Sequence, residues 1–492
     1  MAKHRMAKNF MTGIISFVLI FTVVFIGVQF FTKTGLFRIP GVVYLDESLS
    51  DEEFAFFKNI FTEELDLDKD ITIAARNELV MPELKNNEFL YNIYVPVTDF
   101  YNTETDITVE SADELFTNCL DCPWKLIPIE ELGFSQRLMK INTEYYLDDF
   151  KNGAVFRIIS FDSELYEKEI EPLVAEAMKK TFPEKDTVLT LAQTGVTALS
   201  RGMNAKLYQV GDATYFAEGI KNYLSSFDLT HTSNESSFSG YAGTRNICSD
   251  RRFIDTLTAI GLDIVELTGN HNQDCGDISA LETIDTYVAN GIKMVGGGKT
   301  ADEAAVPLEI EQKNNNITML AYNLSTGGAT YDNTPGANQY YEDVAAAQIS
   351  EAKSRGDLVI VDIQYYECNA YDYTYENQTC DYAGSMAGDQ IGFFRHLIDL
   401  GADVVVGTSA HQPQTFELYG NGAIYYGLGN LFFDQIWWPG TTRSLILVHH
   451  IYKDKILQTD IVPTVYGNEM QTRLMDEDTA RWFLQRLINV RP

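Results

Sequence analysis

The feature that most constrains the fold is a regular alternation of strand-like and helix-like segments from residue 187 onward. Aliphatic runs such as "VLTLAQTG", "DIVELTG", "DLVIVDIQYY" and "ADVVVGTSAH" are typical of buried strands. Amphipathic segments such as "TYFAEGIKNYLSSF", "SALETIDTYVANG" and "IGFFRHLIDLG" lie between them and predict helices. This alternation predicts an α/β fold with a largely parallel inner sheet. Strand follows strand after residue 414, so we expect an antiparallel portion to complete the domain.

An uninterrupted apolar stretch near the N-terminus predicts a membrane anchor. Residues 10–31 read "FMTGIISFVLIFTVVFIGVQFF", which is long enough to cross a bilayer as a helix. Basic residues are slightly denser before this stretch than after it, so residues 1–9 are expected in the cytoplasm and the rest of the chain outside. The sequence after Phe31 has no small-x-small cleavage site. This favours an uncleaved anchor, and a cleaved secretory signal is the alternative.

The charge balance narrows the choice of partners. The formal net charge is −33, from 70 acidic and 37 basic residues. Such a surface repels phosphate backbones, so nucleic acid is not expected as a partner. It also repels other polyanions at long range. A polyanionic ligand would therefore need a local basic pocket or a bridging metal ion.

Three segments are expected after the anchor. Residues 35–181 mix acidic amphipathic and strand-like stretches, and they predict a smaller, membrane-proximal α/β domain of unknown role. Residues 187–470 form the main domain, and residues 471–492 are expected to end the chain as a helix.

Six cysteines in an exported chain suggest disulfides. Fifteen full pairings of six cysteines are possible. We expect Cys248–Cys275 and Cys368–Cys380, each closing a loop, and Cys119–Cys122 as a tight pair. The "CLDC" sequence around that last pair could instead be half of a metal site or a redox pair, although no second CxxC completes a zinc site.

Polar residues gather where the predicted strands end. Ligands of α/β sheets bind beyond the carboxyl ends of the strands. Here those ends are followed by segments such as "TGVTALSRG", "HTSNESSF", "TGNHNQDCG" and "GTSAHQPQ". The side chains that could converge on one cleft are Arg201, Asn234, Glu235, Asn270, His271, Asp274, Gln364, Glu367, His411, Gln414, Asn430 and Asp434.

The order and character of these segments resemble the CapA or PgsA family of capsule-polymer proteins, which act in poly-γ-glutamate synthesis and look like calcineurin-type metallophosphoesterases. The resemblance covers residues 187–470. It is most specific at "SNESSF", "ELTGNHNQD", "GTSAHQPQTFELY" and "YYGLGNLFFDQ". It implies a metallophosphoesterase-like layered α/β sandwich with mixed sheets. The transmembrane helix and the smaller α/β domain would precede that sandwich.

The resemblance also implies roles for single residues. The expected metal ligands are Glu235, Asn270, Gln364 and His411. His271 and His411 would be catalytic, and the substrate would contact Arg201, Asn234 and Gln414. Three positions depart from the family pattern, because Val196 stands where an Asp is typical and Gln364 and Ser409 stand where His residues are typical. The remaining donors could hold one divalent ion such as Mn²⁺, Mg²⁺ or Ca²⁺, and they look too few for two ions.

Single residues also have structural interpretations that stay open. Arg201 could bind a substrate carboxylate or only pair with one of the many acids. Asn270 could hold a turn or cap a helix. Gln364 could be a hydrogen-bonding spacer.

Three functions follow as hypotheses. The first is a membrane-anchored component of anionic polymer synthesis or export, working with synthase or export subunits. The second is an extracytoplasmic metal-dependent phosphoesterase or amide hydrolase. The third is a polymer-binding scaffold without catalysis, which would require a basic patch made by Arg201, Arg245, Arg251 and Arg252.

Overall fold

The computed structural model describes residues 43–46, 48–60, 71–104, 106–117, 122–162, 182–325, 327–330, 332–365, 390–436 and 440–492. The predicted anchor at residues 10–31 lies outside these ranges, as do Glu367 and the three cysteines Cys119, Cys368 and Cys380. No helix within the described ranges is both long enough and apolar enough to cross a membrane.

The chain forms two compact units. Unit 1 contains the described residues up to Val95 together with the described residues of segments 108–120 and 151–182. Unit 2 contains segments 96–107, 121–150 and 183–492. The sequence pattern grouped segments 96–107 and 121–150 with the smaller domain, whereas the fold includes them in unit 2.

Unit 1 is built on a mixed sheet, in which β1 pairs parallel with β2 and the other pairs are antiparallel. Strand β2 pairs with β8 along its length, and β8 pairs in turn with the first part of β3. The core of this unit is aromatic and aliphatic. Phe57, Ile73 and Phe161 are fully buried, and the rings of Phe57 and Phe161 meet edge to face. The elements of this unit are β1 (Val43–Leu45), α2 (Asp51–Ile60), β2 (Ile71–Glu78), the first part of β3 (Glu88–Asp99), α3 (Ala112–Thr117) and β8 (Val155–Asp162).

Unit 2 begins with short elements and continues into two large sheets. The last residues of β3 pair with β6 inside this unit. The short elements are β4 (Asp106–Ile107), β5 (Trp124–Pro128), η1 (Ile129–Glu131), β6 (Gln136–Leu138), β7 (Lys140–Ile141) and α4 (Tyr146–Asp149).

The first large sheet of unit 2, here called sheet I, has eight strands in the order β14-β13-β10-β9-β24-β25-β26, with β23 beside β9. Strands β14, β13, β10, β9 and β23 are parallel, and β24, β25 and β26 continue the sheet antiparallel. The bounds are β9 (Leu189–Thr197), β10 (Leu229–Asn234), β13 (Ile264–Glu266), β14 (Lys293–Val295), β23 (Asn430–Phe432), β24 (Arg443–Tyr452), β25 (Lys455–Val465) and β26 (Arg473–Leu474).

The second large sheet, sheet II, has six strands in the order β16-β17-β19-β20-β22-β21. Its four central strands are parallel and its two edge strands are antiparallel. The bounds are β16 (Leu308–Gln312), β17 (Asn315–Asn323), β19 (Leu358–Gln364), β20 (Val404–Gly407), β21 (Phe416–Tyr419) and β22 (Gly422–Tyr425). Three short strand pairs complete the unit: β4 with β7, β11 (Phe238–Ser239) with β12 (Ser249–Asp250), and β15 (Gly297–Gly298) with β18 (Gly336–Ala337).

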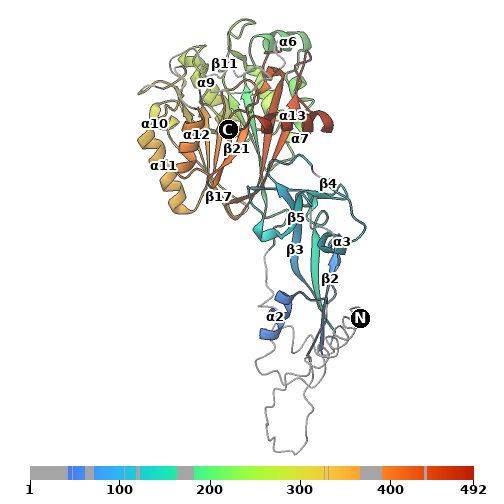
Figure 1. The fold of residues 1–492 in the computed structure, drawn as a ribbon. Coiled ribbons are helices and arrows are strands. Elements are labelled where there is room, and N and C mark those ends of the chain that lie inside the picture. The colour runs from blue at the N-terminus through green and yellow to red at the C-terminus, as the bar shows by residue number, and fades with distance from the viewer. Residues whose placement is uncertain are drawn as a thin grey trace, which may run out of the picture. The chain divides into compact units, whose positions relative to one another are not determined.

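The two sheets face each other across one apolar core. Leu191 and Leu447 of sheet I share this cluster with Ile360 and Val406 of sheet II. Helices cover the outer faces, because a second cluster joins sheet I to α6–α9 and a third joins sheet II to α11 and α12 (Figure 1). The bounds are α6 (Gly202–Val210), η3 (Ala213–Ala217), α7 (Lys221–Leu224), η4 (Arg251–Phe253), α8 (Ile254–Ala259), α9 (Asp277–Ala289), α10 (Ala301–Ala304), α11 (Glu342–Arg355), α12 (Gln390–Asp399), η5 (Gly440–Thr442) and α13 (Glu477–Asn489). The predicted α/β class with mixed sheets is confirmed.

One predicted helix is interrupted. The segment "TYFAEGIKNYLSSF" forms the 3-10 turn η3 and the short helix α7 instead of one amphipathic helix. Gly219 lies between them, and a Cβ at this position would stand 2.4 Å from the carbonyl oxygen of Thr472. A close backbone approach from a distant segment therefore overrides the local helical pattern.

Candidate functional site

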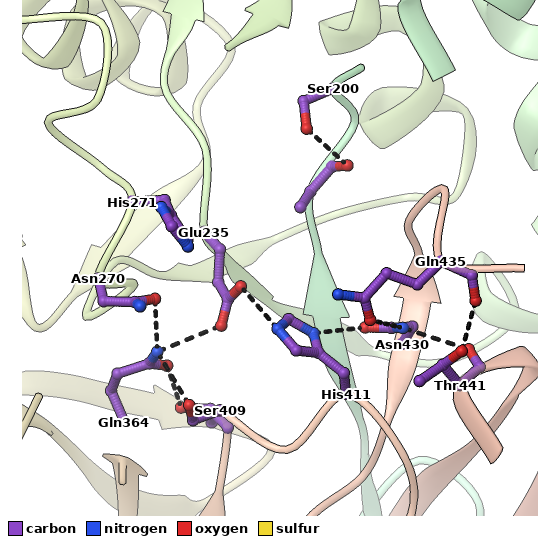
Figure 2. Close-up of polar contacts among 12 residues, drawn as sticks. Ser200, Glu235, Asn270, His271, Gln364, Ser409, His411, Asn430, Gln435 and Thr441 are labelled. Carbon is purple, nitrogen blue, oxygen red and sulfur yellow. Dashed lines mark hydrogen bonds and ion pairs between the residues drawn. The ribbon is translucent and has the colours of Figure 1, made fainter. Parts of the chain in front are cut away.

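The candidate site lies where parallel strands of both sheets end. Glu235 directly follows β10, and Asn270 lies in the loop after β13. Gln364 is the last residue of β19, and the loop after β20 carries Ser409 and His411. Figure 2 shows the Glu235 carboxylate between the Gln364 amide and the His411 ring. The strand ends therefore bring together the four residues predicted to hold a metal.

The side chain of Gln364 is the centre of these contacts. Its Nε2 lies 3.2 Å from Oε1 of Glu235, 3.1 Å from Oδ1 of Asn270 and 3.3 Å from Oγ of Ser409. Its Oε1 accepts from the hydroxyl of Thr408 at 3.4 Å. A primary amide has two N–H groups, so three oxygens share two protons. An ionised Glu235 can only accept hydrogen bonds, so the Gln364 amide turns its nitrogen, and not its oxygen, toward Glu235.

His411 is held in one orientation by its neighbours. Its Nδ1 lies 2.9 Å from Oδ1 of Asn430, whose Nδ2 donates at 3.2 Å to the carbonyl of Thr441. That donation identifies the Asn430 oxygen as the atom facing the ring, so Nδ1 of His411 carries the hydrogen. Nε2 then faces Oε2 of Glu235 at 3.8 Å, and both side chains are buried.

His271 has its own carboxylate partner. Its Nδ1 lies 2.9 Å from Oδ2 of Asp274, and its side chain is 27% exposed. Gly269 brings this loop against β10, because a Cβ there would stand 2.5 Å from the Cα of Glu235. The predicted disulfide Cys248–Cys275 is confirmed, and it ties the end of the loop to the segment before β12. His271 is thus a partly exposed imidazole on a loop fixed from two sides.

The arrangement does not fit a metal centre as it stands. A hard cation would need the oxygens of Glu235 and Asn270, and both accept from the Gln364 amide, whose nitrogen has no lone pair for a metal. The described part of the chain contains no group of three or more His, Cys, Asp or Glu side chains placed to hold an ion. Val196, at the position of the typical Asp, is fully buried in an apolar cluster. Binding of one divalent ion stays a prediction, and it would require the Gln364 amide to turn its oxygen inward.

The residues predicted to contact substrate are spread out. Arg201 pairs with Asp434, whose other oxygen accepts from the backbone N–H of Gly202 at 2.8 Å. The Arg201 guanidinium also lies over the ring of Phe433 at 4.5 Å, and that ring lies 5.2 Å from His411. This ion pair matches the structural interpretation of Arg201.

Asn234 and Gln414 make local contacts. The Asn234 amide donates to the carbonyl of Ser236 at 2.9 Å, and the Gln414 side chain accepts from Gln390 at 3.2 Å. Both residues are buried. Their roles in substrate binding stay predictions.

The basic residues needed for the scaffold hypothesis have acidic neighbours. Arg251 pairs with Glu282, and Arg252 pairs with Asp250 at 3.0 Å. Two of the positive charges are therefore balanced locally, and the described contacts do not create a strongly basic patch.

Sequence reasoning missed a buried polar layer directly beneath the site. It consists of Gln193 on β9, His231 on β10, Glu266 on β13 and Asp362 on β19, all fully buried. The sequence does indicate this layer, because the acidic residues Glu266 and Asp362 interrupt the aliphatic strands "DIVEL" and "DLVIVDI". We name these four residues the polar layer.

The polar layer changes the chemistry of Glu266. Burial raises the pKa of this carboxyl group to about 8, and the charges of Asp362 and Glu235 add to the rise. The backbone N–H of Thr268 donates to its Oε1 at 2.6 Å. Glu266 therefore keeps its proton to a higher pH than an ordinary glutamate does.

Replacing Glu266 with glutamine is expected to change how stability depends on pH. The folded protein holds this proton up to about pH 8, whereas the unfolded chain releases it near the ordinary value of 4.5. Stability of the native protein should thus fall as pH rises between these values, by about 1.4 kcal/mol per pH unit from this group. Glu266→Gln lacks this slope. Urea unfolding of both proteins from pH 5 to pH 8.5 measures the difference, and a difference that does not vary with pH would contradict the assignment.

Comparison with known proteins identifies the domain that contains the site. The family model "Bacterial capsule synthesis protein PGA_cap" matches residues 190–435, half of the chain. The chain is 26% identical over 219 residues to the "PGA biosynthesis protein CapA" of Bacillus subtilis (strain 168), covering 44% of this chain and 54% of that protein. It is 28% identical over 220 residues to the "Capsule biosynthesis protein CapA" of Bacillus anthracis, covering 42% and 50%.

A more distant match is a "Probable polyglutamine synthesis accessory protein" of Mycobacterium tuberculosis, 24% identical over 248 residues, covering 47% of this chain and 60% of that one. The chain spans 50–60% of the length of these curated relatives. The matched region contains every residue of the candidate site, from Arg201 to Asp434. The chain therefore belongs to the bacterial capsule synthesis protein family PGA_cap.

Proposed function

We propose that this protein acts outside the cytoplasm as a membrane-anchored component in the synthesis or export of an anionic polymer of the poly-γ-glutamate type. The observation that carries the proposal is the family match over residues 190–435, which contains the whole candidate site. Two relatives are named as CapA proteins of capsule or PGA biosynthesis. The apolar stretch at residues 10–31 supports anchoring, with synthase or export subunits as partners.

The fold supports the same proposal. Two mixed sheets pack face to face with helices on both outer sides, which is the layered sandwich expected of a metallophosphoesterase-type domain. Its site is assembled from amide, hydroxyl, imidazole and carboxylate groups at strand ends. The amide, hydroxyl and imidazole groups can hydrogen-bond to the amide bonds of such a polymer, whereas its carboxylates would need a basic group or a bridging metal ion beside the site.

Deleting the gene in its own organism tests the proposal. The deletion strain should lose or shorten its surface polymer, and a plasmid copy of the full chain should restore it. The polymer is measured as glutamate released by acid hydrolysis of the surface fraction and by chain length on gels. Unchanged polymer in the deletion strain would overturn the proposal.

One observation favours hydrolysis of the polymer as a second candidate function. The His271 ring is oriented by Asp274 at 2.9 Å and is partly exposed, as an imidazole that transfers a proton to a leaving group would be. Purified protein should then shorten the polymer, and His271→Ala should abolish shortening. A variant as active as the parent would remove the residue on which this candidate depends.

A further inference from the structure

The polar layer crosses the space between the two sheets. Oδ1 of Asp362 lies 2.5 Å from Nε2 of Gln193, and Oδ2 of Asp362 lies 3.2 Å from Nε2 of His231. Asp362 belongs to sheet II, whereas Gln193 and His231 belong to sheet I. Neither ring nitrogen of His231 has a hydrogen-bond partner among the described residues, and Oδ2 of Asp362 lies within ion-pair distance of its Nε2. The contact of Asp362 with Gln193 is a directional hydrogen bond between the two sheets, whereas the contact of Asp362 with His231 is electrostatic and not hydrogen-bonded.

The same two strands carry the site. Asp362 lies two residues before Gln364 on β19, and side chains two apart on a strand point to the same face. His231 lies on β10, which ends at Asn234, directly before Glu235. The contact of Gln364 with Glu235 also joins sheet II to sheet I. The polar layer and the site therefore lie next to each other along β10 and β19, and both make contacts between these two strands.

Apolar packing alone would leave the relative position of the sheets loosely defined. Burial of hydrophobic side chains is non-directional, so it resists separation of the sheets more strongly than sliding. A buried His–Asp contact contributes little net stability, because both groups lose their hydration. What it can supply is a defined geometry between the elements that carry it.

We propose that Asp362 and His231 are positioning residues that set the distance between Glu235 and Gln364 across the two sheets. The effect on the distance between Glu235 and Gln364 depends only on the contacts of the polar layer. The expected effect on polymer production rests on the proposed function of the site. Neither residue is proposed to touch substrate.

The test replaces both groups with leucine, His231→Leu with Asp362→Leu. The urea midpoint should fall, because the buried Nε2 of Gln193 loses its acceptor and leucine is larger than aspartate. Crystal structures of the parent and the variant should show the separation of Gln364 Nε2 and Glu235 Oε1, now 3.2 Å, lengthened beyond hydrogen-bonding range. Polymer production in the complemented deletion strain should be lost.

A second variant keeps the proposal testable if the double variant does not fold. Asp362→Asn retains size and an oxygen that can accept from Gln193, and it removes the charge next to His231. The side-chain amide resonance of Gln364 in this variant should shift relative to the parent. An unchanged resonance, or an unchanged distance in the leucine variant, would overturn the positioning role.

The matched control is the pair His450–Asp460, 2.9 Å apart. It has the same chemistry and lies on β24 and β25 of a single sheet, so it does not bridge the two sheets. His450→Gln should leave the contact of Gln364 with Glu235 unchanged. If the leucine variant shifts that contact while polymer stays normal, positioning holds and the proposed function of the site fails. If the contact is unchanged, positioning fails whatever the polymer does.

Discussion

Replacing Cys248 and Cys275 together with alanine is expected to lower the free energy of unfolding of unit 2 by about 3 kcal/mol. The two cysteines are 27 residues apart, and a cross-link across a loop of this length restricts the unfolded chain by about that amount. The link also holds the end of the loop that begins at Gly269 and carries Asn270 and His271. Urea unfolding measures the loss, and hydrogen exchange should show faster opening of residues 267–276.

A single replacement distinguishes the effect of losing the disulfide bond from the effect of losing the two cysteine side chains. Cys275→Ala alone should lose nearly as much stability as the double variant, because either change removes the covalent bond. If the double variant unfolds within about 0.5 kcal/mol of the parent, a typical effect of a surface change, the disulfide does not stabilise this unit.

Replacing Gly269 with alanine is expected to disturb the site and cost about 1–3 kcal/mol of stability. The added Cβ would stand 2.5 Å from the Cα of Glu235 and 2.8 Å from the carbonyl oxygen of Asn234. Both contacts are with backbone or Cα atoms, so relief requires movement of β10 or of the loop itself. Glu235 and Asn270 lie next to the point where Gly269 contacts the end of β10. The variant should therefore lose polymer production as well as stability.

Gly133→Ala is the control for this change. A Cβ at Gly133 would meet no atom within 4 Å, and its backbone is not left-handed. It should unfold like the parent and support normal polymer. Polymer production by Gly269→Ala at the parent level would show that this close approach does not matter for function.

The large elements could be predicted from the sequence, because hydrophobic periodicity and turn glycines determine them locally. The helix α8 ends before Gly261 and α9 before Gly291, each with the positive φ that glycine readily adopts. The hairpin between β21 and β22 turns at Gly420 in the same way. The break between η3 and α7 could not be predicted, since it depends on the backbone of Thr472, far along the chain.

The site was predicted in part. Parallel strands place their carboxyl ends at one edge, so Glu235, Asn270, Gln364 and His411 could be grouped from sequence, and they do meet. The orientation of the Gln364 amide could not be predicted, because it depends on which oxygens surround it in three dimensions. The pairing of Arg201 with Asp434 likewise joins residues that follow β9 and β23, two strands that only the sheet order brings together.

Surface polymer in the deletion strain carrying Glu235→Gln tests the central claim most directly. Glu235 is the fully buried carboxylate between Gln364 and His411, and glutamine keeps its size while removing the charge that both partners face. Glu351→Gln, at a side chain that is 74% exposed, is the matched control. At equal protein levels we expect Glu351→Gln to restore the polymer and Glu235→Gln to leave it lost or shortened. Full restoration by Glu235→Gln would contradict the claim that this site carries the function.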